Sequence, residues 1–199
     1  MNMPVDLPIT VALGPMRMVL RQCPAEVVEV AVDFAAMYDQ MPQSPDPVTH
    51  MTVDITRNAR SMMLRRRYDV WVDGEARFEN RRAAELLPCL EWAINMQIIR
   101  TRNDFLQIHA ATLSCDDGAM ILTAESGSGK STTAAGLCTA GWQYMCDEFA
   151  LIEPRTLEAH PLPKALCVKA GSFDAIRAVG LSLHAERYYA KAFKGRVGY

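Results

Sequence analysis

The chain has 199 residues, of which half are hydrophobic and 22% are charged, with a net charge of −2 and a pI near 6.1. This is the composition of a globular protein, and the length suits one compact domain or one domain with a small appendage. The weak negative charge gives no overall positive field that would attract nucleic acid or an acidic membrane, so we expect neither as a partner.

Compartment and metal content are also constrained by composition. Met1–Thr10 lacks the basic segment and apolar run of a signal peptide, and no apolar stretch approaches the ~20 residues of a membrane span. The six cysteines form no CxxC pair, and their spacings do not suit a zinc site. We therefore expect a cytoplasmic protein with reduced cysteines.

The N-terminal third predicts alternating strands and one helix. Met16–Cys23 is typical of a short strand, and Pro24 then stands where a helix often begins. The apolar residues at helical spacing after it are Val27, Val30, Phe34 and Tyr38. Three prolines within 41–47 predict a loop.

Further strands follow this loop. His50–Thr56 and Met62–Val72 have the composition of strands. Asp73-Gly74 is a turn signal, and Ala76–Glu79 would return as the second strand of a hairpin. Up to this point the pattern predicts a small α+β lobe.

The middle of the chain predicts a helix and a second hairpin. Apolar residues recur on one helical face at Leu87, Leu90, Ile94 and Ile98, which predicts a helix over Pro88–Thr101. Phe105–Leu113 is expected to be a strand, Asp116–Gly118 a tight turn and Ala119–Thr123 the returning strand.

Another helix and two strands are expected further on. Thr132–Thr139 should be helical, with Gly141 at its C-cap. Trp142–Cys146 and Ala150–Glu153 are the next expected strands. Strands and helices alternate, so we expect an α/β fold with a mixed sheet.

A glycine-rich loop is the most informative motif. Ala124–Ser131 has the spacing of a Walker A loop, with alanine in place of the first glycine. Gly127 and Gly129 leave the backbone bare and permit positive φ, so that several N–H groups can point at one polyphosphate. Lys130 would contact the β- and γ-phosphates, and the Ser131 hydroxyl would complete a Mg²⁺ shell. The candidate nucleotide-binding residues are Glu125, Ser126, Gly127, Ser128, Gly129, Lys130, Ser131 and Thr132.

The context of this loop supports the motif. A strand is expected before it at Met120–Leu122 and a helix after it at Thr132–Leu137, as phosphate binding at a helix N-terminus requires. The alternative is a glycine-rich turn that happens to contain a lysine. Lys130 is, however, the first lysine in the chain. We therefore expect the chain to bind MgATP.

An acidic pair is expected near the phosphate loop. Asp147 and Glu148 end the strand that follows the loop's helix. In a right-handed β–loop–α–β unit the two strands are parallel, so their carboxyl ends share one edge of the sheet. A carboxylate there can hold Mg²⁺ or accept a proton from an attacking hydroxyl. The alternative is a solvated acidic pair that opens a loop.

His109 is placed by register. If a two-residue turn at Asp116-Asp117 or Asp117-Gly118 closes the hairpin, counting outward puts His109 opposite Ala124 or Ser126, at the mouth of the phosphate loop. A lone histidine is as often a structural residue, so a functional and a structural role both stay open.

These features together resemble the catalytic domain of the HPr kinase/phosphorylase family, and more closely its branch called HprK-related kinase A. The resemblance spans Trp92–Ile176. The segments that carry it are Trp92–Asn95, His109–Ala111, Ser126–Thr132, Gly141-Trp142, Asp147–Leu151, Leu162-Pro163 and Val168-Lys169.

The resemblance implies a P-loop kinase-like core and transfer of a phosphoryl group from ATP to a hydroxyl of a protein or peptide. Asp147 would be the base that activates the acceptor, with Glu148 beside it and His109 as a neighbour that tunes it. Lys130 and Ser131 would bind phosphate, and Ser131 and Asp147 would bind Mg²⁺. The branch is associated with a small PqqD-like partner, and the parent family forms ring-like assemblies, which implies a homo-oligomer.

Two positions depart from the family. Glu148 stands where the parent family has Asp, and Thr132 where it has Glu. The resemblance therefore does not imply the reverse, phosphorylase reaction. Relatives also continue well past the position of Tyr199, so we expect a C-terminally truncated form.

The expected organisation is a small α+β lobe over 1–81, a P-loop kinase-like core over 82–180 and a tail over 181–199. Besides a protein kinase of the HPr-kinase type, two functions stay open at this point. One is a nucleotide-binding regulatory or assembly protein without transfer activity. The other is a small-molecule kinase or simple NTPase.

Overall fold

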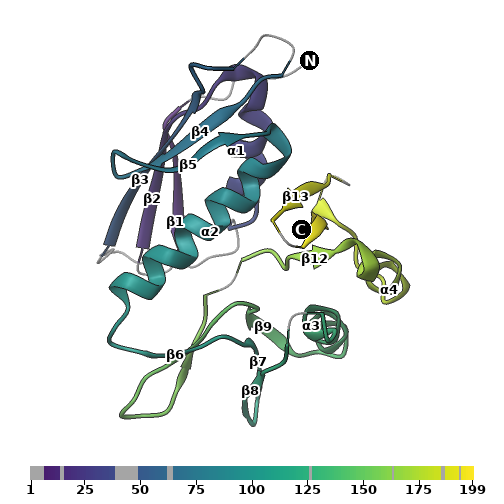
Figure 1. Ribbon diagram of the computed structural model, residues 1–199. Coiled ribbons are helices and arrows are strands. Elements are labelled where there is room, and N and C mark those ends of the chain that lie inside the picture. Colours follow the sequence, from purple (N-terminus) through teal and green to yellow (C-terminus); the bar gives the residue numbers. More distant parts are fainter. Residues whose placement is uncertain are drawn as a thin grey trace. The chain divides into compact units, whose positions relative to one another are not determined.

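The structure is a computed structural model that describes residues 7–13, 16–38, 49–61, 65–125, 127–162, 164–184, 187–192 and 194–199 (Figure 1). The chain forms two compact units. Unit 1 contains Met1–Gln97 and Tyr189–Ala192, and unit 2 contains Ile98–Tyr188 and Phe193–Tyr199. The division falls between Gln97 and Ile98, whereas the sequence suggested a soft boundary near Arg81.

Unit 1 contains a five-stranded mixed sheet, so the expected mixed α/β class is confirmed, although the mixed sheet lies in this unit and not in the later core where it was expected. The strands lie in the order β1-β2-β3-β4-β5, with β2 and β3 parallel and the other neighbours antiparallel. Their bounds are β1 Ile9–Leu13, β2 Met16–Gln22, β3 Thr49–Arg57, β4 Tyr68–Val72 and β5 Glu75–Arg81.

The core of unit 1 follows from strand alternation. Along β2 and β3 every second side chain is buried, which places Met18, Leu20, Met51, Val53 and Ile55 on one face with no exposed surface. Burial of such side chains is the main favourable contribution to folding. The helices of this unit are the 3-10 turn η1 Ala25–Val27, α1 Val28–Ala36 and most of α2 Ala83–Thr101.

Helix α2 begins earlier than the sequence suggested. The expected start was Pro88, but the helix starts at Ala83 and contains Pro88 within it. The reason is a cap: the Glu85 carboxylate accepts a hydrogen bond from the Arg82 backbone N–H at 2.7 Å, which satisfies an N–H that the helix start leaves unpaired. The prediction of the helix was right and its first residue was wrong.

Strand β4 is shorter than expected. The prediction began at Met62, and 62–64 lie outside the described residues, as does the loop expected at 41–47. The strand starts at Tyr68 because Arg67 is engaged in a loop: its N–H donates to Ser61 Oγ at 2.8 Å, and its carbonyl accepts from Asn58.

The described residues of unit 2 form several small sheets and the helices α3 and α4. The strands β8, β7 and β9 form one sheet, β11, β10 and β6 a second, and β12 pairs with β14. The bounds are β6 Leu106–Ile108, β7 Ala111–Cys115, β8 Gly118–Leu122, α3 Lys130–Thr139, β9 Gln143–Cys146, β10 Ala150–Ile152, β11 Ala159–His160, β12 Val168–Lys169, η2 Ala170–Ser172, α4 Phe173–Ala178 and β14 Gly195–Gly198.

The single strand expected over Phe105–Leu113 was wrong. It is divided into β6, which pairs with β10, and β7, which pairs with β8 and β9. His109 and Ala110 lie between the two strands, and Ala110 is fully buried against Ala150 and Ile152. A change from one sheet to another has no signature in an alternating apolar pattern, so the sequence could not reveal it.

The hairpin register and the strand directions around the glycine-rich loop were right. Cys115 pairs with Gly118, so Asp116-Asp117 forms a two-residue turn. Strands β8 and β9 both run antiparallel to β7, which lies between them, so β8 and β9 are parallel to each other. Their carboxyl ends therefore lie on the same edge of the sheet.

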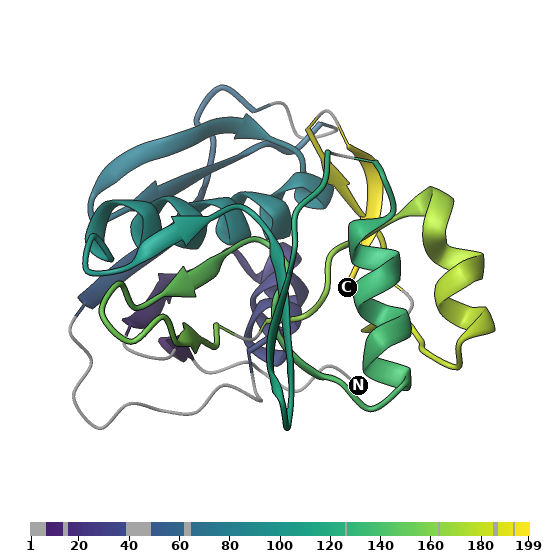
Figure 2. The ribbon, with the colours of Figure 1, turned by 90° about the horizontal axis from the view of Figure 1, so that it is seen from below.

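Helices α3 and α4 lie side by side in unit 2 (Figures 1 and 2). Ala135 of α3 packs with Phe173 and Ile176 of α4 and with Val168 and Leu183 in one buried cluster. This cluster fixes the β12–η2–α4 segment beside the helix that follows the glycine-rich loop. The sequence did not predict α4, β12 or β14.

One short segment from late in the chain belongs to unit 1. Strand β13, Tyr189–Lys191, is held there by two buried carboxylates of that unit. The Tyr189 hydroxyl donates to Asp33, and Lys191 Nζ lies 2.6 Å from Glu91 Oε2. Asp33 is 2% exposed and Glu91 0%.

All six cysteines are unoxidised, as the sequence suggested. None of the helices in the described part of the chain is long and apolar enough to cross a membrane.

Candidate functional site

The glycine-rich loop connects β8 to α3 through two residues in left-handed backbone conformations. Gly127 has φ 99° and Gly129 φ 92°. The loop folds back between them, because Ser128 donates from its N–H and its Oγ to the Glu125 carbonyl, at 3.2 and 2.8 Å. Helix α3 begins at Lys130, two residues before the expected Thr132. Ser126 lies outside the described residues.

Glycine is required at these two positions by conformation and not by crowding. A Cβ added at Gly127 or Gly129 would meet no heavy atom within 4 Å, yet L side chains rarely adopt such φ values. The space beside these two glycines is therefore open. The backbone N–H groups of the first turn of α3, which begins at Lys130, lie next to the loop.

A cavity of about 440 Å³ within unit 2 brings most of the expected residues together. Its volume is within the ~300–1,000 Å³ of typical ligand pockets. The singled-out residues that line it are Glu125, Gly127, Gly129, Lys130, Ser131, Thr132, His109, Asp147 and Glu148. Ser128 is absent from this lining because its hydroxyl turns back to the loop backbone.

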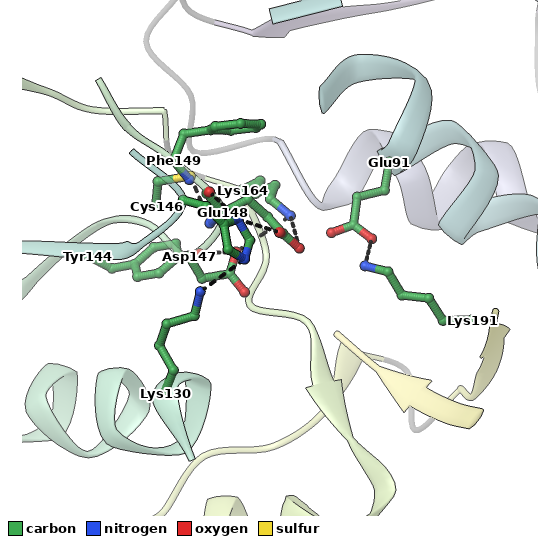
Figure 3. A network of polar contacts seen from close by, with 10 residues as sticks. Glu91, Lys130, Tyr144, Cys146, Asp147, Glu148, Phe149, Lys164 and Lys191 are labelled. Carbon is green, nitrogen blue, oxygen red and sulfur yellow. Dashed lines mark hydrogen bonds and ion pairs between the residues drawn. The ribbon is translucent and has the colours of Figure 1, made fainter. Parts of the chain in front are cut away.

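A buried lysine that was not predicted from the sequence pairs with both carboxylates of the acidic pair. Lys164 Nζ lies 3.5 Å from Asp147 Oδ1 and 4.0 Å from Glu148 Oε1 (Figure 3). Its side chain is 2% exposed, and that of Asp147 3%. A buried ammonium is costly unless it is paired, so Lys164 and Asp147 require one another. The signal in the sequence was a single lysine within the apolar stretch 162–168.

Tyr144 adds a second donor to the same carboxylate oxygen. Its hydroxyl donates to Asp147 Oδ1 at 3.0 Å. Burial, together with the Asp147 charge, raises the pKa of Tyr144 well above its usual value, so the phenol stays a neutral donor. Cys146 is also buried and accepts from the N–H groups of Glu148 and Phe149 through Sγ, at 3.4 Å each. Burial raises the pKa of its thiol to about 11.

His109 lies between the acidic pair and the loop lysine and contacts both. Its Nδ1 lies 2.9 Å from the Glu148 backbone carbonyl oxygen, and its Nε2 lies 3.4 Å from Lys130 Nζ. A carbonyl can only accept, so Nδ1 carries the proton and Nε2 presents its lone pair to the Lys130 ammonium. The paired register ends at Ala111 and Leu122, so His109 lies beyond the hairpin, and it lines the cavity together with Ala124.

The remainder of the cavity is lined by the β12–η2 segment and the start of β14. The polar lining residues of these segments are Lys169, Ser172, Lys194 and Arg196. The β12–η2 segment is joined to the start of α3 by a hydrogen bond of 2.9 Å from Thr132 Oγ1 to Ser172 Oγ. These residues could not be assigned to the site from the sequence, because strands of two to four residues are too short to show a periodicity.

Two oxygen donors in the cavity suit Mg²⁺. The Ser131 hydroxyl and the Asp147 carboxylate both line it, and hard oxygen ligands are those that Mg²⁺ prefers. In the described residues no group of three or more His, Cys, Asp and Glu side chains could hold a metal ion. Mg²⁺ is usually held by one or two carboxylates together with substrate phosphates.

Comparison with protein families gives a match to the SynChlorMet cassette protein ScmC over residues 79–186. The match covers more than half of the 199 residues, and it includes the glycine-rich loop, His109, the acidic pair and Lys164. No curated protein and no solved structure matches the chain. The chain belongs to the ScmC family.

Proposed function

We propose that this member of the ScmC family is an ATP- and Mg²⁺-dependent phosphotransferase of the HPr kinase type, with a hydroxyl of a protein or peptide as the acceptor. One observation carries the proposal. A loop with two positive-φ glycines, the lysine that follows it and a buried aspartate all line one cavity.

The phosphate end of the site follows from backbone chemistry. The helix that starts at Lys130 has ten residues, and its first N–H groups have no partner within the helix. These groups and the helix dipole favour an anion at this end. Lys130 adds a full positive charge, and its ammonium contacts a neutral imidazole nitrogen, which a phosphate oxygen can replace as the stronger acceptor.

The transfer step needs a base for the acceptor hydroxyl and a cation that neutralises the negative charge of the phosphates. The acceptor hydroxyl would give its proton to Asp147 while its oxygen bonds to the γ-phosphorus. The bond from that phosphorus to the β-phosphate bridging oxygen breaks, and ADP leaves. Mg²⁺, held by Ser131 and Asp147, would neutralise the charge of the phosphates. Glu148 would hold His109 through its backbone carbonyl and so orient the ring that contacts Lys130.

One observation favours a second function, nucleotide binding for regulation or assembly without transfer. Lys164 and Tyr144 both engage Oδ1 of Asp147. A carboxylate oxygen that already has two donors accepts a further proton less readily. In that case Asp147 would serve the metal alone.

The first experiment is MgATP binding by calorimetry to the wild type and to Lys130→Met, with Arg155→Met as a control that removes an exposed charge of the same unit. We expect the Lys130 variant to lose ~tenfold or more in affinity, because it loses a charge-assisted bond to phosphate. The control should bind as the wild type does. No binding by the wild type would contradict both functions.

The second experiment separates the two functions. Radiolabelled ATP is added to a lysate and to a purified PqqD-like protein as a candidate acceptor, with wild type, Asp147→Asn and the double variant Asp147→Asn/Lys164→Met. A kinase gives a labelled protein with the wild type only. Binding without label in any sample favours the regulatory function. Label that persists with Asp147→Asn would show that Asp147 is not the base.

A further inference from the structure

The part of the cavity contributed by 167–172 and 194–196, here called the C-terminal wall, has a charge of one sign. Its cationic residues are Lys169, Lys194 and Arg196, and none of the lining residues that it contributes is acidic. The carboxylates of the cavity, Glu125, Asp147 and Glu148, come from the other segments. Of the four lysines and arginines that line the cavity, three therefore belong to the C-terminal wall and one, Lys130, to the glycine-rich loop.

Two of these cations are not neutralised within the described chain. There, neither Lys194 nor Arg196 forms an ion pair with a carboxylate, although the protein has more acidic than basic residues overall. Some arginines elsewhere in the described residues do pair, as Arg102 does with Asp104 and Arg82 with Glu85. Cations that line a concave surface without a counter-charge create a local positive potential that attracts an anion.

Arg196 is also held in place by apolar contacts. Its guanidinium lies over the Tyr188 ring at 4.7 Å and over the Phe173 ring at 5.7 Å from the ring centroids. The two rings are themselves in contact, with centroids 5.2 Å apart, and Tyr188 accepts a hydrogen bond from Arg177. A stacked guanidinium keeps its N–H edge available for a planar or tetrahedral oxyanion, and little entropy is lost when it binds.

The strand pairing fixes the remaining geometry. Lys169 of β12 pairs with Val197 of β14, so Lys169 lies next to the residue that follows Arg196. Val197 is fully buried, and it anchors the strand from which Arg196 projects. Lys194 and Arg196 are two residues apart, and both line the cavity.

We propose that the C-terminal wall is a second anion-binding site, distinct from the glycine-rich loop, that takes a phosphate or carboxylate oxyanion within the same cavity. The oxyanion can come from two sources: the terminal phosphate of a nucleotide, or an acidic group of the acceptor. The first source rests on the proposed function. The site itself requires only the cations of the wall.

The test uses the full chain and the double variant Lys194→Met/Arg196→Met, with Arg155→Met as the control. Orthophosphate binding is measured by calorimetry without nucleotide and with saturating MgADP, and MgATP and MgADP affinities are measured in parallel. Lys194→Arg/Arg196→Lys keeps the charges and serves as the rescue. We expect the double variant to lose orthophosphate binding by ~tenfold or more, and the rescue to restore most of it.

The outcomes separate the two sources. A loss of MgATP affinity with unchanged MgADP affinity assigns the wall to the terminal phosphate. Unchanged affinity for both nucleotides, with loss of orthophosphate binding to the MgADP-loaded chain, assigns it to an acceptor group. If the wild type binds no nucleotide, the proposed function fails, and orthophosphate binding to the free chain still tests the wall. The proposal is wrong if orthophosphate binds equally to the wild type and the double variant, or to neither.

Discussion

At the scale of single residues, the candidate site depends on groups that compensate one another below the cavity surface. Lys164 and Asp147 are both buried, and each offsets the cost of desolvating the other. Tyr144 adds a neutral donor. Asp147 thus lines the cavity with an ammonium and a phenol both directed at its Oδ1.

Replacing Lys164 with methionine should destabilise the protein by about 3–5 kcal/mol, because Asp147 and Glu148 lose a buried counter-charge. The double variant Lys164→Met/Asp147→Asn, in which both partners are neutral, should recover most of this loss. Urea unfolding followed by circular dichroism measures both free energies. Equal stability of the single and double variants would show that the pair is not coupled.

A second residue-scale prediction concerns acid stability of unit 1. A hydrogen bond from Arg57 lowers the pKa of Glu26 from 4.5 to about 2. The folded state thus holds Glu26 ionised more readily than the unfolded state, and this contribution to stability is present above pH 4.5 and disappears as the pH falls toward 2. Because Arg57 is largely exposed, the contribution is about 1 kcal/mol or less.

The difference in unfolding free energy between the wild type and Glu26→Gln should therefore shrink as the pH falls from 7 to 3. Urea midpoints at several pH values measure it, and Glu75→Gln, which removes an exposed carboxylate of the same unit, is the control. A difference that stays constant over this range would contradict the assignment.

At the scale of elements, the glycine-rich loop was predictable because its backbone conformation requires glycine at particular positions. Only glycine adopts φ near 90–100° without strain, and the spacing of Gly127, Gly129 and Lys130 predicted both the loop and the helix after it. The hairpin register was predictable for the same reason, since a two-residue turn permits few alignments.

Other elements could not be predicted from local pattern. The change of sheet at His109-Ala110 depends on contacts of Ala110 with β10, which is distant in sequence. The C-terminal wall is formed by elements too short for periodicity to be seen. Lys164 was missed because its partner lies seventeen residues earlier, and only the folded chain brings them together.

A glycine series tests the conformation of the loop. Gly127→Ala and Gly129→Ala should each cost about 1–2 kcal/mol, since the left-handed conformation is unfavourable for alanine. Gly136→Ala, inside α3 with no atom near the added Cβ, should instead stabilise by up to about 1 kcal/mol. Thermal unfolding of the three variants measures the contrast. Similar effects at all three positions would show that the loop glycines do not need positive φ.

At the scale of the whole molecule, each unit depends on a segment that is separated from the rest of it in sequence. Strand β13 belongs to unit 1 although it follows most of unit 2 in the sequence. The residues after it belong to unit 2 again, and they include Lys194 and Arg196 of the cavity. The charge distribution is equally uneven, because a protein of net charge −2 gathers cations at one wall.

Lys191→Met should destabilise unit 1 by about 3–5 kcal/mol, because Glu91 is fully buried and loses this partner. Lys191→Met/Glu91→Gln should be less affected than the single variant. Hydrogen exchange of α2 amides reports the local loss. Unchanged exchange in the single variant would show that the ion pair contributes nothing to the stability of that helix.

Because Tyr189–Ala192 belongs to unit 1, the chain cannot be cut once into two fragments that each contain one whole unit. A break after α2 removes Tyr189 and Lys191, which bind Asp33 and Glu91, from unit 1. A break before Tyr189 has the same effect and also takes β14 from unit 2. Co-expressed fragments should therefore reassemble only when the C-terminal peptide is supplied, and the intact chain should melt in one transition instead of two.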